Sequence, residues 1–178
     1  MLRNDIILKM PAATSSNSTY APAPFDRAKV DILLHSSDNV DFRVFELFLS
    51  LASPFFESLF DIPQPSQASE GQVIKDGLVV VPMEEDSKTL YILLSFCYPC
   101  TFIYDPHPEV FEDALDVLEA SQKYLLDAIE LKICRAFSNP KILEPEPLRC
   151  FAIAHRAQLR DETLLAAKYT LTQPLIPG

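Results

Sequence analysis

The stretch Val40–Phe60, VDFRVFELFLSLASPFFESLF, places three structural signals in immediate succession. Apolar residues first alternate with polar ones, at Val40, Phe42 and Val44, which is the period of a half-buried strand. The period then lengthens to that of a helix, and a Ser-Pro break separates this helix from a second one. The apolar residues of the two helices are Leu47, Phe48, Leu51, Ala52, Phe55, Phe56, Leu59 and Phe60. So many large apolar side chains, with few candidate catalytic groups, favour a scaffold built for contact.

A second alternating row precedes this stretch and includes Ile32 and Leu34. Pairing Leu34 with Phe42, and Ile32 with Val44, brings the two apolar rows together, whereas a one-residue slip would place each row opposite polar residues. This register requires an odd-length loop. The segment Ser37-Asp38-Asn39 fits, with Asn39 in the left-handed conformation that closes a three-residue turn.

The helix break and the segments that follow it also have clear signals. Ser53 is a candidate N-cap, and Pro54 suits the first position of the second helix. Residues 61–76 are polar and are expected to form a surface loop. A turn at Asp76-Gly77 then leads into a buried strand over Leu78–Val81 that Pro82 ends. Helical periods follow, from Asp86 or Ser87 to about Tyr98, from Pro108 through Leu125, at 129–137, and roughly over 147–158 and 161–171.

These segments predict three parts of the chain. Residues 1–24 are rich in Ser, Ala and Pro and are expected to be a disordered leader. Residues 25–138 are expected to form one α+β domain, and residues 146–171 a C-terminal helical extension. The tail after Pro174 stops abruptly, which suggests a fragment of a longer protein.

Charge and composition exclude several classes of function. The net charge is −10 and the basic residues are dispersed, so we expect no binding to nucleic acid. The three glycines cannot assemble a phosphate-binding loop. No apolar run is long enough to span a bilayer, and the N-terminus is a poor signal peptide. With four scattered cysteines, the chain is expected to be intracellular, in the nucleus or the cytoplasm.

The order strand, strand, helix hairpin, strand, helices resembles a BTB/POZ domain, especially of the fungal kind. The matching residues are Asp31 in the first strand, Phe42 and Val44 in the second, and the turn Leu51-Ala52-Ser53-Pro54-Phe55-Phe56. Residues 76–99, DGLVVVPMEEDSKTLYILLSFCYP, are similar to the third strand and the helix after it. Residues 118–133, LEASQKYLLDAIELKI, are similar to the late helix pair.

This resemblance implies a small three-stranded sheet capped by a helix hairpin and further helices. It also implies a module that binds proteins, by self-association, by corepressor recruitment, or as an adaptor on a cullin-type ubiquitin ligase. Three departures bear on the partner. Phe45-Glu46 stands where a His-basic pair is usual in that family, so these two positions do not supply the basic residue that the resemblance would pair with Asp31. Residues 1–24 have no helical period for a swapped N-terminal helix, and Asp61-Ile62-Pro63-Gln64 does not match the cullin-binding element.

One element suggests chemistry. Cys97-Tyr98-Pro99-Cys100 resembles the motif of thiol–disulfide oxidoreductases, but it follows a predicted helix, whose C-terminus disfavours a thiolate. A zinc site would need His107 with distant Cys134, Cys150 or His155, which is not the paired spacing of structural zinc sites. A thiol redox or zinc protein therefore remains the alternative from another class.

We expect a non-enzymatic interaction module, with no cofactor, no small-molecule substrate and no membrane partner. Its partners are expected to be a second copy of itself, a cullin-type scaffold, or both. The predicted surface consists of the exposed face of the Ser53–Asp61 helix and a groove beside Cys97–Tyr104. The side chains predicted to bind partners are Glu57, Ser58, Asp61 and Tyr98.

Overall fold

The computed structural model describes residues 18–61, 73–99 and 114–172, and within them the chain divides into two compact units. The sheet unit contains residues 18–45 and 73–87. The helical unit contains residues 46–61, 88–99 and 114–172.

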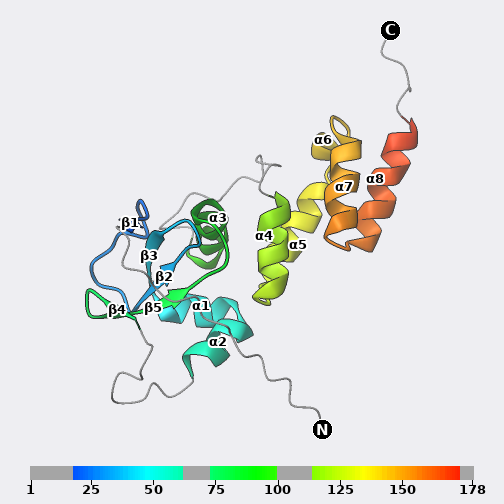
Figure 1. Ribbon diagram of the computed structural model, residues 1–178. Helices are drawn as coiled ribbons and strands as arrows, with labels where there is room; N and C mark the ends of the chain where they lie inside the picture. Colours follow the sequence, from blue (N-terminus) through cyan, green and yellow to red (C-terminus); the bar gives the residue numbers. More distant parts are fainter. Residues whose placement is uncertain (1–17, 62–72, 100–113, 173–178) are drawn as a thin grey trace. The chain divides into compact units, whose positions relative to one another are not determined.

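The sheet unit is built on a mixed sheet of five strands in the order β1-β3-β2-β5-β4 (Figure 1). The strands are β1 (Thr19–Tyr20), β2 (Ile32–His35), β3 (Val40–Val44), β4 (Ile74–Lys75) and β5 (Leu78–Pro82). The pairs β2–β3 and β4–β5 are antiparallel, whereas β1–β3 and β2–β5 are parallel. A parallel pair needs a long connection, and the chain between β2 and β5 supplies it.

The β2–β3 hairpin has the predicted register. Ile32 pairs with Val44, and Leu34 pairs with Phe42. Asn39 has a φ of 65°, the left-handed conformation expected for the end of the three-residue turn. The turn is closed by the Ser36 amide, which donates to the carbonyl of Val40 at 2.9 Å.

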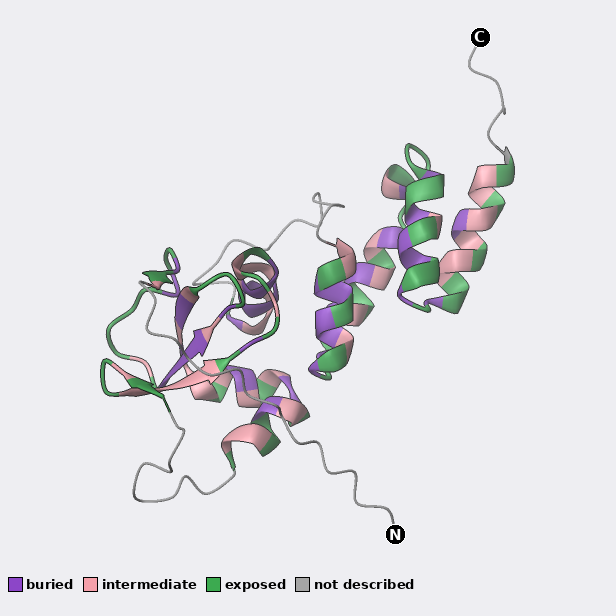
Figure 2. Ribbon diagram, in the orientation of Figure 1, coloured by how far each residue is buried: buried purple, intermediate pink, exposed green. Residues whose placement is uncertain are grey.

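Burial follows the position of each strand in the sheet (Figure 2). The central strand β2 is buried on both faces at Ile32, Leu33 and Leu34. β5 forms as predicted, but Val79–Val81 are half-buried and Pro82 is its last residue. The core of this unit includes Phe25, whose ring packs against Phe42 at 5.7 Å between centroids.

The α+β class is confirmed, and two details of the sheet differ from the prediction. The sheet has five strands instead of three, because β1 and β4 add two residues each at its edges. β1 also lies inside the predicted leader of residues 1–24, so residues 18–24 depart from the prediction of disorder. Strands this short have no hydrophobic period that a sequence pattern could reveal.

The helical unit contains two short helices from the predicted hairpin and a series of later ones. The hairpin helices are α1 (Glu46–Ala52) and α2 (Pro54–Phe60). The later helices are α3 (Ser87–Cys97, whose first residue belongs to the sheet unit), α4 (Ala114–Lys123), α5 (Asp127–Phe137), α6 (Pro140–Leu143), α7 (Pro147–Arg156) and α8 (Arg160–Thr172). None of the helices in the described ranges is both long and apolar enough to cross a membrane.

The predicted helical periods match most of these elements. α3 buries Leu90, Leu93 and Leu94, and α5 buries Ile129, Ile133 and Phe137, as their spacing predicts. Leu125 differs, because α4 ends at Lys123 and Leu125 has a φ of 53° beyond it. The predicted start of that helix at Pro108 lies outside the described residues.

The first residue of α3 is capped by a residue far away in sequence. Asp38, in the β2–β3 turn, accepts hydrogen bonds from the Ser87 amide at 2.8 Å and from the Ser87 hydroxyl at 2.6 Å. Burial by itself would raise the pKa of Asp38, but the hydrogen bonds from Ser36 and Ser87 outweigh it and lower the pKa. The turn that sets the hairpin register therefore also holds the start of α3.

Candidate functional site

The first candidate for a binding surface is the outer side of α1. Leu47 and Leu51 lie four residues apart, on one face of the helix, and are 62% and 77% exposed. Leu49 lies between them in sequence, on the opposite side, and is fully buried. α1 is thus anchored by one buried leucine and presents two exposed leucines on its outer face.

The geometry of the α1–α2 hairpin depends on Ser53. Its hydroxyl oxygen accepts hydrogen bonds from the amides of Phe55 and Phe56 at 3.1 and 3.2 Å, which makes it the predicted N-cap of α2. The same hydroxyl donates to the carbonyl of Tyr124 at 2.5 Å. Ser53 is 1% exposed, so one buried side chain joins the hairpin to the end of α4.

Aromatic rings anchor α2 on the same side. Phe56 is fully buried, and its ring stacks on those of Tyr124 and Phe60, with centroids 5.2 and 5.9 Å apart. Phe55 meets Phe56 edge-on at 5.4 Å. These contacts direct the other side of α2 outward.

The residues predicted to bind partners do not form one group. Glu57, Ser58 and Asp61 are exposed along and just after α2, as expected. Tyr98 differs, because its side chain is only 6% exposed and meets the ring of Phe48 edge-on at 4.9 Å. Its spacing on the α3 pattern could not distinguish a surface position from a core position. The predicted groove beside Cys97–Tyr104 lies outside the described residues from Cys100 onward.

The thiol alternative is weakened at Cys97. Burial raises the pKa of this thiol to about 12, and its sulfur lies 3.4 Å from the carbonyl oxygen of Leu93. A thiol with such a pKa is a poor nucleophile at neutral pH. Cys100 and His107 lie outside the described residues. Within the described residues, no group of three His, Cys, Asp or Glu side chains is placed to hold a metal ion.

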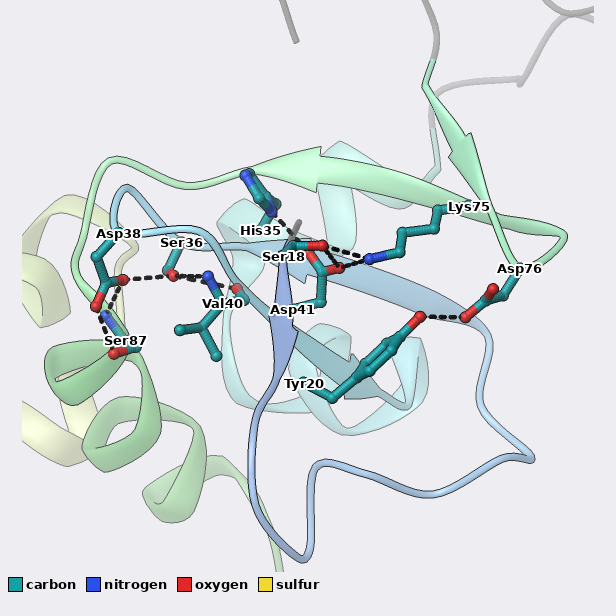
Figure 3. A network of polar contacts seen from close by, with 10 residues as sticks. All are labelled: Ser18, Tyr20, His35, Ser36, Asp38, Val40, Asp41, Lys75, Asp76 and Ser87. Carbon is teal, nitrogen blue, oxygen red and sulfur yellow. Dashed lines mark hydrogen bonds and ion pairs between the residues drawn. The ribbon is translucent and has the colours of Figure 1, made fainter. Parts of the chain in front are cut away.

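A second cluster, in the sheet unit, surrounds the carboxylate of Asp41 on β3 (Figure 3). Asp41 is 1% exposed and accepts hydrogen bonds from His35 Nδ1 at 2.6 Å and from the Ser18 hydroxyl at 2.7 Å. It also forms an ion pair with the ammonium group of Lys75. Burial alone would raise the pKa of Asp41, but the hydrogen bonds from Lys75, His35 and Ser18 outweigh it and hold the pKa below its ordinary value.

No pattern in the sequence reveals this cluster, and the family resemblance points to another aspartate. The aspartate that the resemblance singles out in the first strand is Asp31, which is exposed and directly precedes β2. Asp41 alternates with the apolar residues of β3, a position that usually faces solvent. The cluster lacks the layout of a nucleophilic triad, because the Ser18 hydroxyl donates to the aspartate and not to the histidine ring. Its direct role is to hold a buried charge.

The fold and these sites define an α+β module with an exposed apolar face on α1. The family model for the BTB/POZ domain matches residues 25–141, which is more than half of the chain. The chain therefore belongs to the BTB/POZ family, whose domain is a protein–protein interaction module. No curated protein matches the sequence.

Proposed function

We propose that this chain is a non-enzymatic interaction module that associates with a second copy of itself through the outer face of α1. The observation that carries this proposal is the pair Leu47 and Leu51, which are 62% and 77% exposed next to the fully buried Leu49. In a two-fold dimer the same patch meets itself, so each interface would cover four leucines. Covering one leucine contributes about 1.5–3 kcal/mol, enough in sum to support association.

The test is the double substitution Leu47→Glu with Leu51→Glu. We expect light scattering to report a dimer for the native chain and a monomer for the variant, with at least about tenfold weaker association. A dimer of the variant would have to bury four carboxylates against one another at the interface. Circular dichroism should be unchanged, because both side chains are exposed.

Leu148→Glu is the matched control. Leu148 is 72% exposed on α7, so this variant places one leucine-to-glutamate substitution at a comparable exposure outside the proposed interface. Its association should equal that of the native chain. A native chain that is monomeric at about 100 µM, well above typical affinities for stable dimers, would exclude the proposal.

A role as adaptor on a cullin-type ubiquitin ligase is the second candidate. It is supported by the exposed polar side of α2, where Glu57, Ser58 and Asp61 share one face. We expect Glu57→Lys with Asp61→Lys to reduce capture of a purified cullin scaffold by about tenfold or more, because the two changes reverse the charge of the proposed contact surface. Asp26→Lys, at an exposed turn of the sheet unit, should have no effect. If the Glu57→Lys, Asp61→Lys variant captures as much cullin scaffold as Asp26→Lys and the native chain do, α2 is not part of the interface.

We further propose that the chain is a fungal-type member, that it is located inside the cell in the nucleus or cytoplasm, and that it divides into a domain over 25–138 and a helical extension over 146–171. A thiol or zinc role for Cys97-Tyr98-Pro99-Cys100 is disfavoured by the raised pKa of Cys97. Tyr98 would affect binding indirectly. It is buried against Phe48 of α1, so a substitution at Tyr98 would shift the outer face of that helix.

A further inference from the structure

The edge strand β1 has very little backbone support. It has two residues and pairs in parallel with Val40 and Asp41 of β3. The Thr19 amide donates to the carbonyl of Asn39 at 3.2 Å, and the Ala21 amide donates to that of Asp41 at 2.9 Å. Thr19 and Tyr20 are both exposed. A strand of two residues at a sheet edge is not stable through its backbone hydrogen bonds alone, so β1 also depends on its side chains.

Those side chains are held by the opposite edge of the sheet. Ser18 accepts a hydrogen bond from the Lys75 ammonium and donates one to Asp41. The hydroxyl of Tyr20 donates to the carboxylate of Asp76, in the turn that follows β4 (Figure 3). Lys75 and Asp76 thus contact both residues that flank Thr19.

The ring of Tyr20 adds a second kind of contact. The Lys75 ammonium lies 4.7 Å and the Arg43 guanidinium 4.8 Å from the ring centroid, within the range of cation–π attraction. Arg43 in turn pairs with Asp76 at 2.5 Å. These contacts of Ser18 and Tyr20 therefore each involve a charged side chain.

We propose that residues 18–20 form a detachable strap that is clasped by Lys75, Asp76 and Arg43. When the strap leaves, it uncovers the backbone edge of β3 at Val40 and Asp41 together with the Asp41 carboxylate. The rest of the sheet has its own bonds, such as the Ser36 amide to the Val40 carbonyl and the Met83 amide to the His35 carbonyl. Opening of the strap is consequently a local event, separate from unfolding.

The clasp makes the opening sensitive to ionic strength. Cation–π contacts and partly exposed ion pairs weaken as salt screens them. Tyr20 is 42% exposed, and the side chains of Arg43 and Asp76 are 18% and 43% exposed, so salt reaches this side of the strap. In the closed state the Asp41 carboxylate is 1% exposed, so salt reaches the Asp41–Lys75 ion pair from the Lys75 side only, and this pair remains to balance the charge of Asp41 when the strap opens.

The test is hydrogen exchange of individual amides in the full chain. We expect Ser18→Ala with Tyr20→Ala to accelerate exchange of the Ala21 amide by about tenfold or more. The Ser36 and Met83 amides should keep their native rates, because their acceptors belong to the hairpin and to β2. Tyr20→Phe keeps the ring on both cations and loses only the hydroxyl, so its effect should be intermediate. Lys29→Ala, at an exposed position outside the strap, is the control.

Salt provides the second readout. Raising sodium chloride from about 0.05 to 1 M should accelerate the Ala21 amide in the native chain and not in the double variant, since the variant has no clasp left to screen. The proposal is overturned if the Ala21 amide keeps its native rate in the double variant. It is equally overturned if Ser36 and Met83 accelerate by the same factor as Ala21, because the strap would then not be separable from the sheet.

Discussion

Phe56→Ala is expected to lower the free energy of unfolding by about 3–5 kcal/mol, the largest effect of any single substitution considered for this chain. The Phe56 ring is fully buried and stacks on Tyr124 and Phe60. Its removal leaves a cavity among the rings of Phe60, on the same helix, and Tyr124, in the turn after α4, and a close-packed core fills such a cavity only in part. Urea unfolding followed by circular dichroism measures the loss as a shift of the midpoint.

Two variants make this result specific. Phe60→Ala removes a ring of equal size at a half-buried position of the same helix, so it should cost clearly less. Phe56→Leu keeps most of the volume and should cost about 1–1.5 kcal/mol. If Phe56→Ala destabilises no more than Phe60→Ala, the stacked cluster is not the centre of this core. Phe56→Leu also supplies a folded reference if the alanine variant does not accumulate.

The features that could be predicted from the sequence are local ones. The hairpin register follows from two apolar rows, and a slip by one residue would have reversed both of them. The left-handed Asn39 follows from the loop length that this register demands. Ser53 as N-cap and Pro54 as first helical residue follow from preferences at adjacent positions. In each case the deciding residues lie within a few positions of one another.

The features that could not be predicted depend on partners distant in sequence. The second bond of Ser53 goes to Tyr124, and Asp38 accepts from Ser87; the local patterns do not show that these residues meet, because they lie 71 and 49 positions apart. The buried carboxylate of Asp41 accepts hydrogen bonds from Lys75 and Ser18, which lie 34 and 23 positions away in sequence. Tyr98 was assigned to the surface since a pattern of helical residues cannot show what packs against the end of a helix.

The same reasoning explains why the fold is easier to predict than the partner. Each helix of the α1–α2 hairpin buries one large residue completely, Leu49 in α1 and Phe56 in α2. From sequence, Leu47 and Leu51 belong to the core face; in the structure, Leu49 takes that position. A surface of this kind is recognised only when burial is known, and its occupant only by measuring association.

Lys75→Met is expected to lower the free energy of unfolding by about 3 kcal/mol at neutral pH. The substitution keeps the length of the side chain and removes the ammonium from a carboxylate that is 1% exposed. Asp41 would keep its bonds from His35 and Ser18, but its charge would remain buried without its cation. The reverse change is milder, because Lys75 is 34% exposed and can turn to water when Asp41 is lost. Chemical unfolding at several pH values measures both effects.

The sign of the pH dependence distinguishes this cause from simple loss of packing. In the native chain the pKa of Asp41 lies below its ordinary value of 3.8. The Asp41–Lys75 pair therefore stabilises the fold fully above pH 3.8, and this stabilisation is lost as the pH falls through the lowered pKa. The difference in stability between the native chain and Lys75→Met should therefore begin to shrink as the pH falls towards 3.8, and it should disappear only below the lowered pKa of Asp41, where the carboxyl is protonated in both. Adding Asp41→Asn to Lys75→Met should restore most of the loss at neutral pH, since no buried charge remains. A pH-independent loss that Asp41→Asn does not rescue would mean that Lys75 acts through packing alone.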